Sequence, residues 1–360
     1  MTLDLGALPR EYPRRYLPKD FTFASWEELE PFFRELEGRG LRTAAEAEEW
    51  LHDLSELLAA IFEERSVRYI RMTCDTANKE YEQAYLKFVE KIEPKLKPVM
   101  RSLMKKFIET PVAGELPEDR YFVLLRSFRN QVELFREENV PLEVEEEKLS
   151  QRYQKLTGAM TVTLRGKELT LQQAAKYLED PDRGVRRDAW EKIAERRLRD
   201  RDELDGLFDE LLSLRQRIAA NAGFGDYRAY AFRKRERFDY TPEDCLSFHA
   251  AVERHVVPVL VALQERRKAE LGVKRLRPWD LDVDPSGKPP LRPFTKAEEL
   301  VEGVAEIFRR LDSELGELFS VLPRYGLLDL ESRKGKAPGG YQATLAERRL
   351  PFIFMNAVGR

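Results

Sequence analysis

The side chains best suited to chemistry in this 360-residue sequence are three histidines, His52, His249 and His255. His249 and His255 are six residues apart, which places them about 120° from each other on a helix, so one metal ion cannot easily bind both. His249 and Glu253 share a helical face at i and i+4. A surface ion pair is the simpler interpretation of these two, and a metal site is the alternative. The histidines alone therefore do not predict a metal centre.

Other common catalytic motifs are missing from the sequence. It contains no HExxH zinc motif, no phosphate-binding loop of the GxxxxGK type and no G-x-S-x-G nucleophile elbow. The two cysteines, Cys74 and Cys245, are too few for a disulfide framework or a clustered zinc site, and each is expected to be a buried thiol. We therefore assign no catalytic residue and no metal ligand in this chain.

Composition narrows the class of protein. Hydrophobic residues make up 42% of the chain and charged residues 35%, with a net charge of -3. The slight acidic balance argues against nucleic acid as the main partner. One of the longest apolar runs, 256–263, is interrupted by Pro258 and is well short of the roughly 18 residues of a membrane span, so no membrane partner is expected. The first residues, MTLDLGAL, lack the layout of a signal peptide, which favours a cytoplasmic location.

Most of the elements that the sequence predicts, and that would position any functional site, are helices. Ser25, Thr43 and Thr295 are each followed three residues later by Glu, which predicts capping boxes at three helix starts. Apolar residues three and four apart from 301 to 322 predict one helix with a narrow apolar seam.

Strand signals are few. The run 160–164 followed by Arg-Gly-Lys predicts a short hairpin that leads to a helix cap at Thr170. The apolar run 350–358 is the other predicted strand.

Three segments near the C-terminus carry a resemblance to a known family. The sequence 337–342, Ala-Pro-Gly-Gly-Tyr-Gln, precedes 351–356, Pro-Phe-Ile-Phe-Met-Asn. Together with 328–333 they resemble the stretch before the zinc helix of oligoendopeptidase F and the thimet-oligopeptidase-like metallopeptidases. Further segments that resemble this family lie at 177–190, 218–227 and 278–281. The resemblance covers most of the chain from about residue 110 onward.

The resemblance implies a fold and a domain organisation. The expected fold class is mainly α, a multi-helix two-lobed body that lines a channel, with a small β hairpin and a C-terminal edge strand. Residues 1–110 would form an N-terminal helical region, 111–190 the family's amino-terminal lobe, and 191–360 the first part of the catalytic domain.

The implied activity is that of a zinc metalloendopeptidase that hydrolyses short peptides. In this family two histidines and a distant glutamate hold the zinc, and the glutamate of HExxH acts as general base. The zinc helix should begin shortly after Arg360, so we expect this chain to lack the zinc ligands and to be inactive alone. The substrate-binding residues carried over are Met355, Asn356 and Ala357, on an edge strand that could pair with a peptide backbone. For Asn356, a turn residue at the strand end is an equal alternative.

A non-catalytic helical peptide-binding scaffold or adaptor is the alternative function, and the residues without the resemblance favour it. Both interpretations expect short peptides as partners, and neither expects nucleic acid or a membrane. The sequence does not define peptide length, cleavage specificity or oligomeric state.

Overall fold

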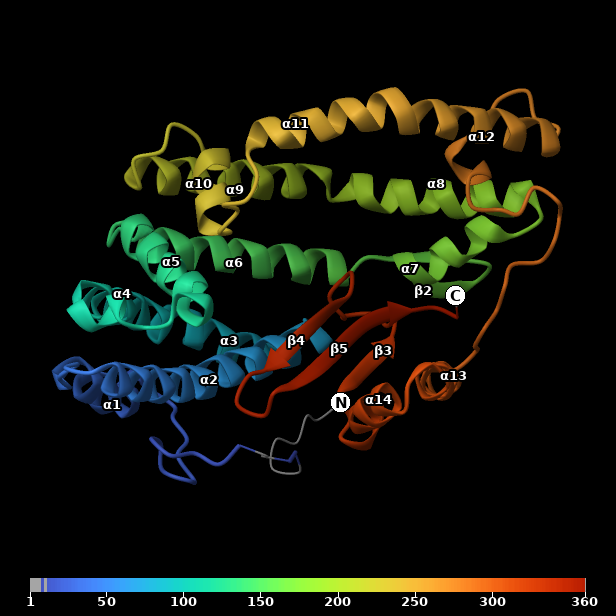
Figure 1. Cartoon of the computed structure of the whole chain (residues 1–360). Helices are drawn as coiled ribbons and strands as arrows, with labels where there is room; N and C mark the ends of the chain where they lie inside the picture. Colours follow the sequence, from blue (N-terminus) through green and yellow to red (C-terminus); the bar gives the residue numbers. More distant parts are fainter. Residues whose placement is uncertain (1–7, 10–11, 360) are drawn as a thin grey trace. The chain divides into compact units, whose positions relative to one another are not determined.

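The computed structural model describes residues 8–9 and 12–359 (Figure 1). Residues 1–7, where the signal-peptide layout was sought, and Arg360 lie outside it. The chain is mainly helical and forms two compact units that do not follow chain order, in agreement with the expected two-lobed fold class. Unit 1 comprises Met1–Lys155, Gly206–Arg237 and Gln342–Phe352; unit 2 comprises Leu156–Asp205, Phe238–Tyr341 and Ile353–Arg360.

Unit 1 contains most of the long helices. They are α1 (Trp26–Gly38), α2 (Ala44–Cys74), α3 (Lys79–Lys91), α4 (Glu93–Glu109), the 3-10 turn η2 (Pro111–Gly114), α5 (Glu118–Leu134), most of α6 (Asn139–Gly158), most of α9 (Arg201–Asn221) and α10 (Tyr227–Lys234). The predicted caps at Ser25 and Thr43 are confirmed at the starts of α1 and α2. Trp50 and Phe107, both fully buried, stack with ring centroids 5.3 Å apart within the largest apolar cluster of the described residues.

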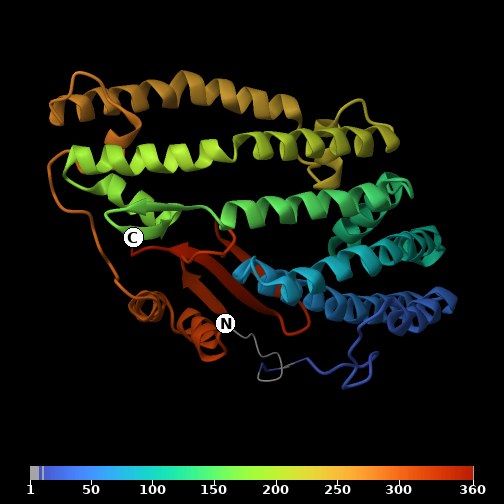
Figure 2. The same ribbon diagram turned by 180° about the vertical axis from the view of Figure 1, so that it is seen from behind.

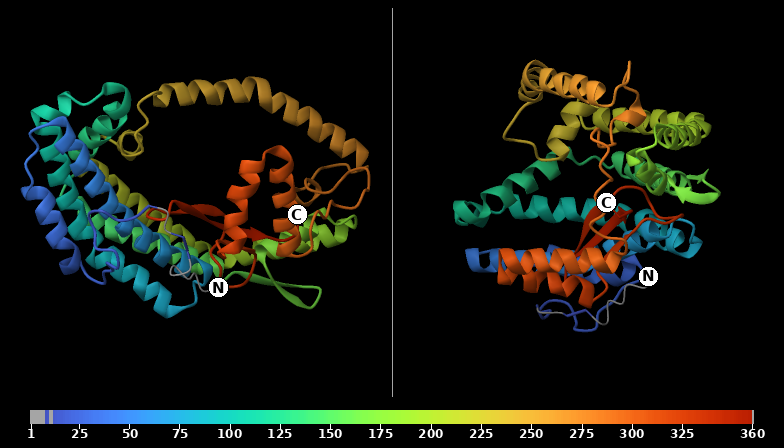
Figure 3. Two further views of the ribbon diagram at one scale, coloured as in Figure 1. Left: turned by 60° about the horizontal axis from the view of Figure 1, so that its bottom comes forward. Right: turned by 90° about the vertical axis from the view of Figure 1, so that its right-hand side faces the viewer.

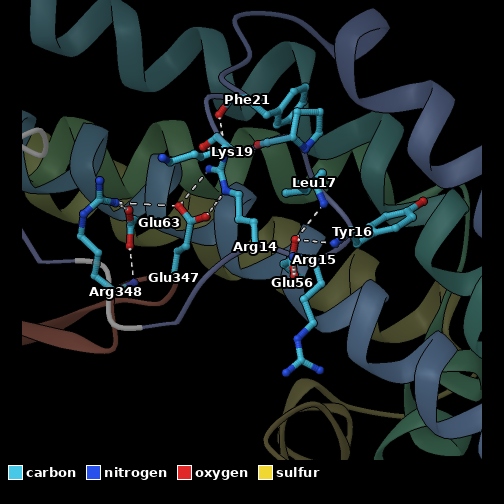
Figure 4. A network of polar contacts seen from close by, with 11 residues as sticks. Arg14, Arg15, Tyr16, Leu17, Lys19, Phe21, Glu56, Glu63, Glu347 and Arg348 are labelled. Carbon is cyan, nitrogen blue, oxygen red and sulfur yellow. Dashed lines mark hydrogen bonds and ion pairs between the residues drawn. The ribbon is translucent and has the colours of Figure 1, made fainter.

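Buried ion pairs attach the β4–β5 turn, residues 346–349 between β4 (Tyr341–Leu345) and β5 (Leu350–Ala357), to the rest of unit 1 (Figure 4). The Glu63 carboxylate, on α2, pairs with the Arg348 guanidinium and accepts a hydrogen bond from the Arg348 backbone N–H at 3.0 Å. Glu347 pairs with Arg14 in the N-terminal segment. These four side chains are only 4–9% exposed, so removing either partner of a pair would leave a buried charge uncompensated.

Unit 2 contains shorter elements. Its helices are α7 (Leu171–Ala175), η3 (Lys176–Glu179), α8 (Arg183–Arg199), α11 (Pro242–Ala251), the π-helical turn η4 (Val252–Val256), α12 (Val257–Glu270), η5 (Pro278–Asp280), α13 (Ala297–Leu311) and α14 (Ser313–Arg324). Its strands include β1 (Thr161–Leu164), β2 (Lys167–Thr170) and β3 (Leu328–Glu331). The predicted β1–β2 hairpin and the cap at Thr170 are confirmed.

The three-stranded sheet corrects one expectation. Its strand order is β3-β5-β4, with β4 at Tyr341–Leu345 and β5 at Leu350–Ala357 (Figures 1 and 2). β5 runs parallel to β3, with Leu328 opposite Ile353 and Asp329 opposite Phe354. The prediction of a strand at 350–358 is confirmed, but its description as an edge strand is wrong, because β3 and β4 flank it. Both neighbours are short and have weak strand signals of their own.

The single helix expected over 301–322 is two helices. Asp312 adopts an extended conformation between α13 and α14, and its carboxylate accepts hydrogen bonds from the Glu314 and Leu315 amides. The two helices then pack on each other, with the Phe308 and Phe319 rings 5.3 Å apart. The predicted seam is therefore only partly covered, because Leu311, Leu315 and Leu318 stay 43–71% exposed. The cap expected at Thr295 also differs, since Glu299 rather than Glu298 accepts the amide hydrogen bonds there.

A long exposed helix corrects the expectation about apolar runs. α11, η4 and α12 continue into one helix, Pro242–Glu270, drawn in gold and orange in Figure 3. Pro258 lies in the first turn of α12, where its missing N–H is tolerated, so it does not end the helix. By length and composition alone, this is the one helix in the described part of the chain that could cross a membrane, and none of its most apolar window is buried. Core helices and signal sequences can pass the same test.

Candidate functional site

The three predicted substrate-binding residues lie together in unit 2. Met355, Asn356 and Ala357, at the end of β5, line an open pocket of about 450 Å³. The rest of the lining comes from the glycine segment before β4, from α7 and from the residue after β5: Gly339, Gly340, Gln172, Ala175 and Val358. Sequence reasoning quoted the two glycines for the family resemblance but did not assign them to the site.

The glycine segment passes closely along β5. Gly339 has φ of 85°, a left-handed conformation that side chains disfavour. A Cβ atom at Gly340 would lie only 3.2 Å from the Phe354 carbonyl oxygen. Each glycine is therefore required for a different reason, and together they leave one wall of the pocket as bare backbone.

Asn356 holds the glycine segment in place. Its Nδ2 donates to the Ala337 carbonyl at 2.9 Å and to the Gly339 carbonyl at 2.8 Å. Both amide protons are thus used inside the protein. This geometry supports a positioning role for Asn356, since the side chain fixes the backbone that lines the pocket.

Lys336 ties the same segment to β3 and β5. Its side chain is fully buried, and Nζ donates to the Asp329 carboxylate at 2.9 Å and to the Met355 carbonyl at 2.5 Å. Nζ also lies 4.5 Å from the centre of the Phe354 ring. Arg333 donates to both oxygens of the Asp329 carboxylate, each at 2.7 Å, and shares Oδ1 with Lys336. In the sequence, this arrangement is indicated only by a lysine two residues before Pro-Gly-Gly, and Lys336 is not among the predicted site residues.

A hydrogen-bonded path also positions α7 beside β5. The Ser332 amide donates to the Ala357 carbonyl at 3.1 Å. The Ser332 hydroxyl shares a buried hydrogen bond of 2.9 Å with Thr170, the cap of α7. Gln173 of α7 donates to the Ser332 carbonyl at 3.1 Å. The cap residue therefore both starts the helix and fixes its distance from the pocket.

A buried charge cluster brings together two of the segments that carry the family resemblance. Asp280 is fully buried and accepts two hydrogen bonds from Arg183, of 2.9 and 2.8 Å, and one from Arg186 at 3.2 Å. Arg186 also donates to the Trp279 carbonyl at 2.9 Å. The hydrogen bonds from Arg183, then those from the Arg277 amide and Arg186, hold the pKa of Asp280 below its usual value against the effect of burial. The cluster fixes η5 to the start of α8.

The residues that could bind a metal do not come together. Over residues 8–9 and 12–359 there is no group of three or more His, Cys, Asp or Glu side chains placed to hold an ion, so the residues present do not fit a zinc ion. His249 and Glu253 are exposed, and no ion pair forms between them in the described structure. Glu253 belongs to the π-helical turn, which alters the i, i+4 spacing on which that expectation rested.

Two sequence families match the chain. Peptidase family M3 matches residues 176–360, and the peptidase M3 N-terminal domain matches residues 19–135. No curated protein sequence matches the chain.

Several solved structures are similar to the chain. A structure of PZ peptidase A with an inhibitor has a TM-score of 0.89 and 28% identity, over 94% of this chain and 61% of that one. A structure assigned as oligoendopeptidase F from Bacillus anthracis has a TM-score of 0.88 and 27% identity, over 96% of this chain and 64% of that one. Another structure assigned as oligoendopeptidase F has a TM-score of 0.88 and 28% identity, with coverages of 94% and 60%.

These matches define a class of mainly helical peptidases. The chain belongs to peptidase family M3. It spans about 60% of the length of the structures that it matches.

Proposed function

We propose that this chain forms the peptide-binding part of a zinc metalloendopeptidase that hydrolyses short peptides. Family membership supports the reaction class. The observation that supports peptide binding is the pocket at the end of β5, where Gly339 and Gly340 present bare backbone beside Met355. Backbone N–H and C=O groups can hold peptides of many sequences in register, because they pair with the peptide backbone rather than its side chains.

The peptide would pair with the glycine segment rather than with β5. β5 pairs with β3 on one side, and on the other side Gly340 lies against Phe354 and Met355. The backbone left for a peptide is therefore that of Gly339 and Gly340, apart from the Gly339 carbonyl, which already accepts from Asn356. Asn356 and Lys336 would act on the substrate only by positioning this backbone.

We also propose that the 360-residue chain binds peptide without cleaving it. The sequence has no HExxH motif, and the described residues do not fit a zinc ion, so no catalytic step is assigned to them. The test is incubation of the purified chain with an internally quenched fluorescent peptide. We expect no cleavage, and cleavage that a chelator abolishes would refute this proposal.

Peptide binding is tested with a matched pair of glycine variants and a short fluorescein-labelled peptide. Gly340→Ala forces a Cβ against the Phe354 carbonyl and should weaken binding roughly tenfold, a loss of about 1.4 kcal/mol. Gly303→Ala, in α13 with open space around its Cβ position, should leave binding unchanged. Fluorescence anisotropy measures both. Equal affinities of the two variants, or no binding by the unmodified chain, would contradict the site.

We propose a cytoplasmic location for the protein. Neither Cys74 nor Cys245 is in a disulfide, as expected for a reducing compartment. Fractionation of cells that produce the protein tests this, and recovery in the membrane or secreted fraction would refute it.

A further inference from the structure

A second cavity is lined only by residues of unit 1, and none of the residues assigned to peptide binding is part of its lining. It has a volume of about 630 Å³, and its lining comes mainly from α2, α3, α4, α5, α6 and α10, together with Glu236 after α10. Figure 1 labels these helices. Volumes of this size are typical of sites for small organic ligands. Most of its surface is apolar, with a lining that includes Phe88, Leu96, Met100, Met104, Phe128 and Leu134.

The acidic groups of this cavity already have partners. Glu93 binds Arg65 at 2.6 Å, and Glu143 binds Lys97 at 2.6 Å. Glu146 binds Arg215 at 2.7 Å.

The two remaining acids are also bonded. Glu147 accepts from the Tyr85 hydroxyl at 2.9 Å, and Glu236 accepts from Ser127 at 2.6 Å. All five carboxylates of the lining are therefore engaged inside unit 1.

Arg101 differs from these groups. Its guanidinium lines the cavity and lies 5.6 Å from the centre of the Phe135 ring. In the described structure it has no hydrogen bond or ion pair, and its Nε is buried without an acceptor. A buried N–H without an acceptor is costly, and a guanidinium is the side chain best matched to a carboxylate.

We propose that this cavity binds a small amphipathic carboxylate, with the carboxylate on Arg101 and an apolar body among the side chains from α4 and α5. The chemistry is shared by a medium-chain fatty acid and by a short peptide with a free C-terminus and apolar side chains. The site shares no residue with the pocket at the end of β5, and its test requires no peptidase activity.

The test measures binding of matched ligand pairs by isothermal titration calorimetry. Decanoate is compared with decanol, and N-acetyl-Leu-Phe with its C-terminal amide. For the unmodified chain we expect the carboxylate of at least one pair to bind roughly 10- to 100-fold more tightly than its neutral partner, since a hydrogen bond to a charged group contributes that much. The pair with the tighter carboxylate identifies the fatty acid or the peptide as the better ligand.

Two variants distinguish a specific contact of the carboxylate with Arg101 from a general effect of positive charge on α4. Arg101→Met should remove the preference for the carboxylate and leave the melting temperature unchanged or higher. Lys105→Met is the control, because Lys105 is exposed on the same helix and does not line the cavity. It should keep the preference. Equal binding of acid and neutral partner, absence of binding by all four compounds, or an unchanged preference in Arg101→Met would overturn the proposal.

Discussion

Large buried aromatic side chains form the core of unit 1, whereas in unit 2 buried charged and polar side chains hold neighbouring segments together. The unit 1 core contains Trp50, Phe88 and Phe107, each at most 1% exposed. In unit 2, Arg186, Asp280 and Lys336 are also 3% exposed or less. Unit 1 also contains buried ion pairs, at the β4–β5 turn.

This difference predicts which changes should destabilise the fold of each unit. Apolar burial is non-directional and adds up over many contacts, so a single change removes only part of it. A buried charge cluster depends on each partner, because losing one leaves the others desolvated and unpaired. Unit 2 should therefore be sensitive to a few positions and to pH, and unit 1, outside its β4–β5 turn, mainly to core volume.

Tryptophan fluorescence can follow the units separately. Of the four tryptophans, Trp26 and Trp50 lie in unit 1, and Trp190 and Trp279 in unit 2. Replacing either pair with Phe leaves reporters in the other unit alone. Coincident urea transitions from both reporter sets would contradict the comparison, because the chain would then unfold as one cooperative body.

The largest expected effect is on the unit 1 core. Phe107→Ala should lower the free energy of unfolding of unit 1 by about 4 kcal/mol, because the buried ring packs on Trp50 and Phe128 and its removal leaves a cavity. Urea unfolding followed by the unit 1 reporters measures it. Phe122→Ala is the control, since that ring is 48% exposed and should cost far less.

The next effect concerns the charge cluster of unit 2. Asp280→Asn should lower the free energy of unfolding of unit 2 by about 3 kcal/mol, because Arg186 would stay buried without its carboxylate. The unit 2 reporters measure it. Asp282→Asn, an exposed site two residues away, should have no effect. A loss below about 1 kcal/mol for Asp280→Asn would show that unit 2 does not depend on this cluster.

Acid should weaken unit 2 through the same group. The pKa of Asp280 is lowered in the folded protein, mainly by Arg183, so its stabilising contribution is present above the unfolded pKa near 3.9 and is lost as pH falls through the folded value. We expect the urea midpoint of unit 2 to fall below about pH 4. Asp280→Asn should flatten this acid limb without changing the unit 1 signal. An equally steep limb in the variant would assign the effect to other carboxylates.

The smallest effect concerns the break between α13 and α14. Asp312→Ala should cost about 1 kcal/mol, because it removes the acceptor for the Glu314 and Leu315 amides at the start of α14. Asp312→Asn keeps an acceptor oxygen and should retain most of the stability. Thermal unfolding monitored by circular dichroism compares the two, and equal losses would show that the cap contributes little.

Local signals in the sequence predicted local structure well. Ser25, Thr43 and Thr170 cap helices as expected, and the hairpin at 161–170 forms, because each depends on residues a few positions apart. The seam at 301–322 was misread because a regular apolar period does not reveal a cap such as Asp312 within it. Pro258 was misread because the effect of a proline depends on its position within the helical turn.

Pairing between distant segments was not predictable in the same way. The central place of β5 depends on β3, which is more than twenty residues earlier and only four residues long. The resemblance located Met355, Asn356 and Ala357, and the structure brings them to one pocket, although their role in substrate binding stays a prediction. The positioning of the glycine segment by Lys336 and Asn356 needed coordinates, because it depends on where side chains end rather than on sequence spacing.

The ion pair between Glu63 and Arg348 has a consequence for synthesis on the ribosome. The two residues are 285 positions apart, so at the usual 5 to 20 residues per second Glu63 waits roughly 15 to 60 s for its partner. During that time α2 can form, but the Glu63 carboxylate cannot yet be buried in its ion pair with Arg348. Unit 1 should therefore mature late, although it also contains residues up to 155, and a pause in translation before residue 342 would prolong its exposure to chaperones and proteases.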